Sequence, residues 1–114
     1  MQHVVAVVQA RMGSTRLPGK VLRPLGGRAV LDWVMTRLAE AERLDQIVLA
    51  TSTSPADDAI AKHAEAYGYS IFRGSEHDVL ARFVGAARFS GATHVIRINA
   101  DNPFLEPAFV DDLV

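Results

Sequence analysis

The sequence of 114 residues contains no cysteine, which excludes a disulfide framework and thiolate chemistry. No apolar run approaches the roughly 20 residues that a membrane-spanning helix needs. No basic and apolar leader precedes the first strand-like segment, so we expect a cytoplasmic protein without a membrane partner. The four histidines lack the spacing of metal ligands, and each is expected to be structural or exposed.

An excess of positive charge is also missing. The chain has 12 basic and 13 acidic residues, with a net charge of −1. Nucleic-acid binding requires many phosphates to be neutralised, so nucleic acid is excluded as a general partner. The length is that of one domain, and the 49% apolar content is enough for a core.

Two common phosphate-binding motifs are absent. The Walker pattern needs four residues between its first glycine and Gly-Lys, followed by Ser or Thr. Here five residues separate Gly13 from Gly19, and Val21 follows Lys20. The dinucleotide pattern GxGxxG does not occur either. The motifs therefore exclude an ordinary P-loop ATPase and a Rossmann dehydrogenase.

What the sequence does contain is the stretch VVAVVQARMGSTRLPGK, residues 4–20. Residues 4–8 are small or β-branched and apolar, which predicts a strand buried on both faces. The next twelve residues bring two glycines, two hydroxyls and three cations. Glycines let backbone N–H groups approach an anion, and Arg and Lys offset its charge. The stretch predicts a phosphate cradle; the alternative is a solvated basic turn.

Helical and strand-like patterns alternate after this loop. We expect helices over 29–43, 54–67 and 78–89, strands over 47–51, 69–72 and 95–99, and a further helix from Pro107. Alternation of this kind predicts an α/β fold, a Rossmann-like parallel sheet with helices on both faces. Ligands bind outside the carboxyl ends of such strands, which here carry residues 9–20, 51–54, 73–77 and 99–103.

Two helices carry more specific expectations. Ser54 and Pro55 begin the first, where Asp57 is expected to complete an approximate capping box and to have a structural role near the positive end of the helix. The buried stripe of the helix over 78–89 is expected to contain apolar side chains, namely Val79, Leu80, Phe83, Val84 and Ala87.

Three segments resemble a known family. QARMGSTRLPGK is similar to the N-terminal signature of cytidylyltransferases of the CMP-sugar (CMP-KDO and acylneuraminate) synthetase type, RGSEHDVLARF to the second signature of the SpsF-like spore coat polysaccharide branch, and ADNPFLEP to the segment that carries the acidic residue of the synthetases. The resemblance implies the N-terminal part of a nucleotide-diphospho-sugar transferase (GT-A-like) domain. We expect residues 1–114 to be one such part, truncated at the C-terminus.

The resemblance also implies roles for individual residues. Arg11 and Lys20 are its phosphate-binding cations and the expected catalytic residues. Arg16 contributes to the phosphates or forms a surface salt bridge. The remaining expected nucleotide-binding residues are Gln9 (base or ribose), Ala10 (space for the nucleotide), Gly13, Ser14 and Thr15 (backbone and hydroxyl donors), and Arg73, Ser75 and Asp78. For Ser75 and Asp78 the alternative is capping of the helix that follows, and for Asp78 we favour the cap.

Asp101 directly follows the last predicted strand and is the magnesium ligand that the resemblance implies. Mg²⁺ prefers one or two carboxylates together with substrate phosphates, so a single aspartate is chemically sensible. The alternative is that Asp101 only shapes a turn with Asn102 and Pro103.

The function that the resemblance implies is transfer of CMP from CTP to a sugar acid or related acceptor, with release of pyrophosphate. Two alternatives stay open: a module that binds a nucleotide or nucleotide-sugar without turnover, and a flavodoxin-like or receiver domain. The cations Arg11 and Lys20 after the first strand argue against the second. A second copy of the chain is a further candidate partner, because a missing half would expose apolar surface.

Overall fold

Four parallel strands form the sheet at the centre of the protein. The computed structural model describes residues 2–13, 19–100 and 106–113. The strands of the sheet are β1 (Val4–Gln9), β4 (Gln46–Ser52), β5 (Ile71–Gly74) and β6 (His94–Asn99). The other elements are a 3₁₀ turn Lys20–Leu22, a small hairpin of β2 (Pro24–Leu25) and β3 (Arg28–Ala29), α1 (Val30–Ala39), a 3₁₀ turn Pro55–Asp57, α2 (Asp58–Tyr67), α3 (Val79–Ser90) and α4 (Pro107–Leu113).

The strand order in the sheet is β5-β4-β1-β6, so β1 lies between β4 and β6. The chain moves outward from β1 through β4 to β5, then crosses back over α3 to place β6 on the other side of β1. The order reverses between β1 and β6, and in doubly wound sheets a crevice for ligands opens at such a point. The predicted α/β class with a parallel sheet is confirmed.

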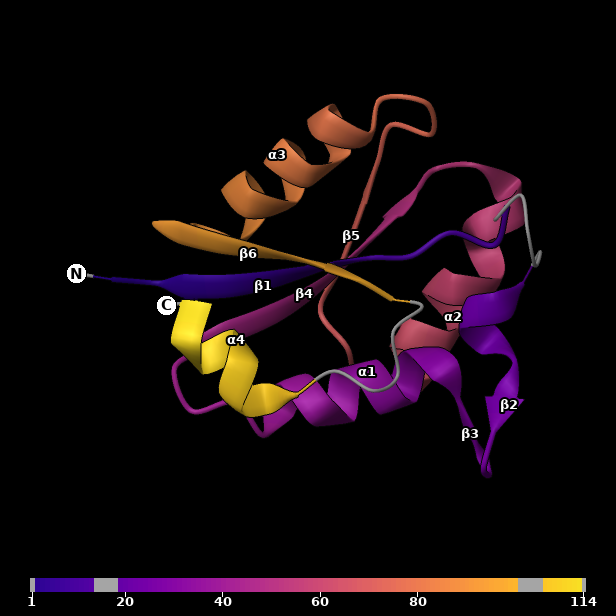
Figure 1. Cartoon of the computed structure of the whole chain (residues 1–114). Helices are drawn as coiled ribbons and strands as arrows, with labels where there is room; N and C mark the ends of the chain where they lie inside the picture. Colours follow the sequence, from indigo (N-terminus) through magenta and orange to yellow (C-terminus); the bar gives the residue numbers. More distant parts are fainter. Residues whose placement is uncertain (1, 14–18, 101–105, 114) are drawn as a thin grey trace.

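Helices cover both faces of the sheet, with α3 on one face and α1, α2 and α4 on the other (Figure 1). All six residues of β1 are buried, as the apolar run predicts. Its side chains alternate between two cores. Ala6 and Val8 pack with α1, α2 and α4, whereas Val5 and Val7 pack with Ala86 of α3. This alternation places Gln9, two residues after Val7, towards α3.

The helix predicted over 29–43 is wrong at its C-terminal end, because α1 stops at Ala39. The carboxylate of Asp111 on α4 accepts hydrogen bonds from the backbone N–H groups of Glu42 and Arg43, at 3.0 and 2.7 Å. These two N–H groups therefore bond a side chain from the other end of the chain instead of continuing the helix.

The strand predicted over 69–72 begins later, at Ile71. Gly68 ends α2 in the left-handed region with φ of 73°, and the N–H of Tyr69 donates to the carbonyl of Ala64 at 2.9 Å. This is a glycine C-cap, which uses the N–H group of Tyr69 before the strand can form. No helix in the described ranges is both long and apolar enough to cross a membrane.

Candidate functional site

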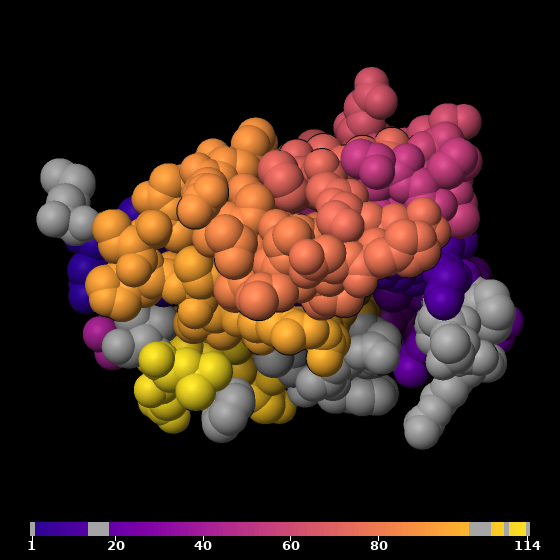
Figure 2. Space-filling view, turned by 90° about the horizontal axis from the view of Figure 1, so that it is seen from above, coloured from indigo at the N-terminus to yellow at the C-terminus, as the bar shows by residue number. Residues whose placement is uncertain are grey.

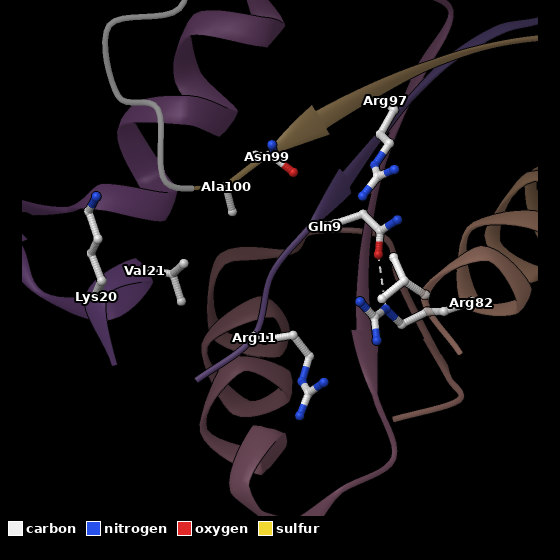
Figure 3. Close-up of a pocket in the computed structure, with 9 residues that line it drawn as sticks. Gln9, Arg11, Lys20, Val21, Arg82, Arg97, Asn99 and Ala100 are labelled. Atoms are coloured by element: carbon white, nitrogen blue, oxygen red, sulfur yellow. Dashed lines mark hydrogen bonds between the residues drawn. The ribbon is translucent and has the colours of Figure 1, made fainter. Parts of the chain in front are cut away.

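A pocket of about 230 Å³ opens where the strand order reverses, at the carboxyl ends of β1 and β6. Figure 3 shows side chains entering it from β1, from the 3₁₀ turn, from α3 and from β6. The residues that line it are Gln9, Arg11, Lys20, Val21, Val79, Arg82, Arg97, Asn99 and Ala100. In the space-filling view the face above this region is formed by α3 and the segment before it (Figure 2).

Four of the lining residues are cations and none of the described ones is a carboxylate. Arg11 and Lys20 come from the segment that the sequence singles out, whereas Arg82 and Arg97 come from α3 and β6. Like charges converging on one pocket repel one another unless an anion separates them. The pocket therefore favours a negatively charged ligand.

Arg11 is held in place by groups from distant parts of the chain. Its Nε donates to Oδ2 of Asp57 at 2.5 Å, and Nη1 donates to the carbonyl of Glu76 at 2.9 Å. The carboxylate of Glu76 lies 3.9 Å from Nη2. The side chain of Arg11 keeps 28% of its surface exposed, so its guanidinium is oriented and still accessible from the pocket.

Asp57 is the anchor of this arrangement and is completely buried. Besides Arg11, its carboxylate accepts hydrogen bonds from the hydroxyl of Ser52 and, at 2.8 Å, from the backbone N–H of Met12. Burial alone would raise the pKa of Asp57. The hydrogen bonds from Ser52 and Met12, together with the charge of Arg11, hold that pKa below its ordinary value. Asp57 is therefore ionised at neutral pH.

The capping box predicted at this helix is wrong in one respect. Ser54 caps the turn, since its side chain accepts from the N–H of Ala56 at 3.4 Å. Asp57 makes no side-chain cap, because its carboxylate bonds Arg11 and Met12 instead. Asp57 was expected to act at the start of the helix; instead its carboxylate bonds residues of the predicted phosphate loop.

The two ends of that loop are joined at their base. The N–H of Gly19 donates to the carbonyl of Met12 at 2.8 Å, while the N–H of Met12 is held by Asp57. Gly19 has φ of 75°, a conformation that suits glycine, and Lys20 begins the 3₁₀ turn directly after it. Gly13 lies at the exposed start of the loop. Ser14, Thr15 and Arg16 lie outside the described residues.

Arg82 lies on the buried side of α3, with only 3% of its surface exposed. Its Nε donates to Oε1 of Gln9 at 3.0 Å and its Nη1 to the carbonyl of Ser75 at 3.0 Å. Burial, reinforced by the charges of Arg11 and Arg97, lowers the pKa of Arg82, and the negative charge of Asp57 opposes that change. No carboxylate in the described ranges pairs with Arg82.

The buried stripe predicted for this helix is therefore partly wrong. Leu80 is 71% exposed and Val84 37% exposed, whereas Arg82 and Ala86 are the buried residues of α3. An apolar pattern favours burial of the apolar side chains, but here the sheet-facing side of the helix also borders the pocket. The inward position near β1 is occupied by a cation that bonds Gln9.

None of the residues of the segment 73–78 lines the pocket. Arg73 donates to the carbonyl of Ser52 at 2.8 Å and to the carboxylate of Asp58 at 2.8 Å, and it does not line the pocket. Asp78 caps α3 by accepting from the N–H of Ala81, and the hydroxyl of Ser75 accepts from the N–H of Asp78. The capping alternative is thus confirmed for Asp78, whereas Ser75 bonds the residue that forms the cap. Direct nucleotide contact by these residues stays a prediction.

Ala10 has its side chain in the core on the α1 face, with 2% of its surface exposed. It adjoins the pocket through its neighbours Gln9 and Arg11, not as a lining residue. Asp101, the predicted metal ligand, lies outside the described residues; it follows Ala100, which lines the pocket. The described residues contain no cluster of three metal-ligating side chains.

Sequence reasoning missed Arg82, Arg97 and the role of Asp57. A signal existed for the two arginines, because each interrupts an apolar pattern: VLARFVGA in the helix and VIRIN in the strand. A cation inside such a pattern marks either a buried partner or a ligand site. No local signal separates Asp57 from the neighbouring Asp58, since both lie at the start of the helix.

A parallel α/β sheet with a cationic pocket at its switch point defines a nucleotide- or phosphate-binding domain. The chain belongs to the cytidylyltransferase family, whose model matches residues 5–114. The resemblance seen in QARMGSTRLPGK is thereby confirmed.

Individual relatives agree with this assignment. The chain is 42% identical over 118 residues to the spore coat polysaccharide biosynthesis protein SpsF of Bacillus subtilis, covering 100% of this chain and 49% of that protein. It is 31% identical to the 3-deoxy-manno-octulosonate cytidylyltransferase of Geobacter sulfurreducens, covering 98% and 44%. The solved cytidylyltransferase of Leptospira borgpetersenii superposes with a TM-score of 0.91 at 33% identity, covering 100% and 49%. The chain thus spans about half the length of the relatives it matches.

Proposed function

We propose that residues 1–114 form the nucleotide-binding part of a single nucleotidyltransferase domain, which transfers CMP from CTP to a sugar acid or related acceptor. The proposed role is in the biosynthesis of surface polysaccharide, in the cytoplasm, where nucleoside triphosphates are available. The observation that carries the proposal is the pocket at the switch point, with four cations and an Arg11 fixed by Asp57. Family membership supports CTP as the nucleotide.

In the proposed reaction a hydroxyl oxygen of the acceptor attacks the α-phosphorus of CTP. A new oxygen–phosphorus bond forms, the bond between the α-phosphorus and the bridging oxygen breaks, and the bond electrons leave with pyrophosphate. The acceptor hydroxyl gives its proton to water. Such a transfer needs positioning and charge stabilisation more than reacting groups from the protein. Arg11 and Lys20 would bind the phosphates and offset the negative charge that develops on the leaving pyrophosphate.

The fixed orientation of Arg11 is the part of this function that the structure makes most specific. An arginine free in solvent would lose side-chain entropy on binding a phosphate. The rotamer freedom of an arginine side chain amounts to about 2 kcal/mol. Asp57 and the carbonyl of Glu76 already restrict Arg11 in the absence of ligand. Because Arg11 is already ordered, it loses less side-chain entropy when it binds a triphosphate.

We propose Mg²⁺ as the cofactor and Asp101 as its protein ligand. The described lining residues supply no carboxylate, so they do not by themselves form a metal site. Mg²⁺ commonly binds one or two carboxylates plus the phosphates of a substrate, which suits one aspartate next to the lining residue Ala100.

Calorimetric titration with CTP, UTP, ATP and GTP, each with and without Mg²⁺, tests the proposal. We expect binding that depends on Mg²⁺ and favours CTP. Binding of every triphosphate with equal affinity would contradict the choice of CTP, and no binding by this chain and by a longer chain would contradict nucleotide binding altogether. Release of pyrophosphate, measured on the longer chain with a sugar acid, separates a transferase from a module that only binds nucleotides.

A further inference from the structure

Gln9, at the end of β1, carries a buried polar atom without a partner. Only 8% of its surface is exposed. Its Oε1 accepts a hydrogen bond from Nε of Arg82 at 3.0 Å, but Nε2 has no hydrogen-bond partner among the described residues. A buried amide donor left unpaired destabilises a protein, so such groups are rare and need an explanation. Gln9 lines the pocket, so this covered donor lies in the pocket wall.

Arg82 determines which way the amide of Gln9 points. A guanidinium has only donors and stays protonated, so the atom of Gln9 that faces it must be the acceptor Oε1. Flipping the amide would set the NH₂ group against the N–H of Arg82. Arg82 is itself held by the carbonyl of Ser75 and by its burial on the inner side of α3. The NH₂ group is therefore locked towards the pocket.

Figure 3 shows the amide nitrogen of Gln9 turned away from Arg82, towards the side of the pocket where Arg97 lies. Both neighbours are cations and cannot accept a hydrogen bond from it. The apolar side chains of Val21 and Val79 also line the pocket. The pocket as a whole therefore offers a fixed donor and apolar surface, and a planar base uses both.

We propose that the Gln9–Arg82 pair reads the base of the bound nucleotide, with Nε2 of Gln9 donating to N3 of cytosine. This rests on the proposed function. Cytosine presents an acceptor at N3, whereas uracil presents an N–H there. A locked donor facing that N–H would leave both groups unpaired, and a polar mismatch of this kind discriminates by about tenfold to a hundredfold. Gln9 contacts the base, and Arg82 is its positioning residue.

The test is the ratio of CTP to UTP dissociation constants, measured by titration in the presence of Mg²⁺. In Gln9→Glu the carboxylate can still pair with Arg82, but an acceptor now faces the base. We expect the preference for CTP to fall by at least about tenfold. Arg82→Gln releases the amide of Gln9 so that it can turn either way, and the preference should fall there too. The matched control is Arg88→Gln, an exposed arginine on the same helix, which should keep the wild-type ratio.

Gln9→Met, which removes the donor and stays apolar, is a second variant in case a buried carboxylate prevents folding. Its preference for CTP should also fall. Equal weakening of CTP and UTP in all three variants would overturn the inference, because Gln9 would then contact the ribose or phosphates; in that case the proposed function stands. A wild type that binds neither nucleotide, or both equally, would overturn the inference together with the choice of CTP.

Discussion

The carboxylate of Asp57 and the guanidinium of Arg11 meet at 2.5 Å although 46 positions separate them in the chain. This pair joins the segment after β1 to the start of α2, and Ser52 at the end of β4 joins them through the same carboxylate. The end of β4, the segment after β1 and the start of α2 are thus fixed to one buried charge. The geometry of the phosphate-binding side depends on Asp57 even though it does not line the pocket.

Replacing Asp57 by asparagine should disturb both stability and binding. Asparagine can still accept from the N–H of Met12, but it removes the charge that holds Arg11 and sets an NH₂ group towards Ser52 or Arg11. We expect a loss of about 2 kcal/mol in the free energy of unfolding, the range for a hydrogen bond to a charged group, and about tenfold weaker CTP binding. Denaturant unfolding and calorimetry measure the two effects.

The control for that experiment is Asp58→Asn. Asp58 is exposed and pairs with Arg73 at the surface. Exposed ion pairs contribute about 0–1 kcal/mol, so this variant should unfold nearly as the wild type does and bind CTP equally well. Similar losses in both variants would show that Asp57 acts through the general charge of the helix start and not through Arg11.

Acid should weaken the protein through Asp57. Because its pKa lies below 3.8 in the folded state, the unfolded chain takes up this proton first as the pH falls. The stabilisation is complete above 3.8 and is lost as the pH falls through that value towards the folded pKa. The difference in unfolding free energy between wild type and Asp57→Asn should therefore shrink as the pH is lowered from neutral to below 3.8. A difference that stays constant over this range would contradict the assignment.

Arg11→Ala and Lys20→Ala should each weaken triphosphate binding by about tenfold to a hundredfold, the value of one charge-assisted hydrogen bond. Both residues are partly exposed, so Lys20→Ala should leave the thermal midpoint nearly unchanged. Lys62→Ala, on the exposed side of α2, removes the same charge away from the pocket and is the control. Unchanged affinity in both pocket variants would exclude the phosphate cradle.

Asp101→Ala should abolish the dependence of CTP binding on Mg²⁺ while leaving the weaker, metal-free binding in place. The reason is that the described pocket offers cations for the phosphates but no carboxylate for a metal. Titration at several Mg²⁺ concentrations measures this. If Mg²⁺ enhances binding to the same degree in the variant, Asp101 is a turn residue and the ligand lies elsewhere.

Gly85 allows α3 to approach Phe72 closely. A Cβ atom at Gly85 would lie 2.6 Å from Cζ of Phe72, well inside contact distance. Alanine favours a helix by about 1 kcal/mol over glycine, but displacing a packed ring costs more, so Gly85→Ala should destabilise the protein by about 1–2 kcal/mol.

In the Phe72→Leu background the obstruction at Gly85 is absent, so Gly85→Ala should be neutral or stabilising there. Denaturant unfolding of the four proteins in this double-mutant cycle measures the coupling directly. A similar effect of Gly85→Ala in both backgrounds would mean that the glycine is needed for another reason.

Local patterns were sufficient for the order of elements and for one wall of the pocket. The apolar run of β1 and the abrupt change after Gln9 predict a buried strand and a phosphate loop, and Arg11 and Lys20 do line the pocket. The end of α1 was misplaced because Asp111, 68 positions away, satisfies a backbone N–H group there. The start of β5 was misplaced because the C-cap at Gly68 uses the N–H of Tyr69, which bonds Ala64.

The other wall of the pocket depends on contacts across the sheet. Arg82 is buried because it meets Gln9, 73 positions earlier, and helical periodicity gives no information on that encounter. Asp57, and not Asp58, bonds Arg11 and Met12, because its side chain faces the segment after β1. Such residues become recognisable only when the crossover that places β6 beside β1 is known.

The four cations of the pocket have a thermodynamic consequence for the free protein. Arg11 and Arg97 repel Arg82 in the folded state, and a small anion that enters the pocket relieves this repulsion. An anion that binds only the folded protein stabilises it by mass action, in proportion to the logarithm of its concentration once the pocket is nearly saturated. The melting temperature of this protein is thus also a property of the buffer: phosphate, sulfate and pyrophosphate solutions will give higher values than chloride at equal ionic strength.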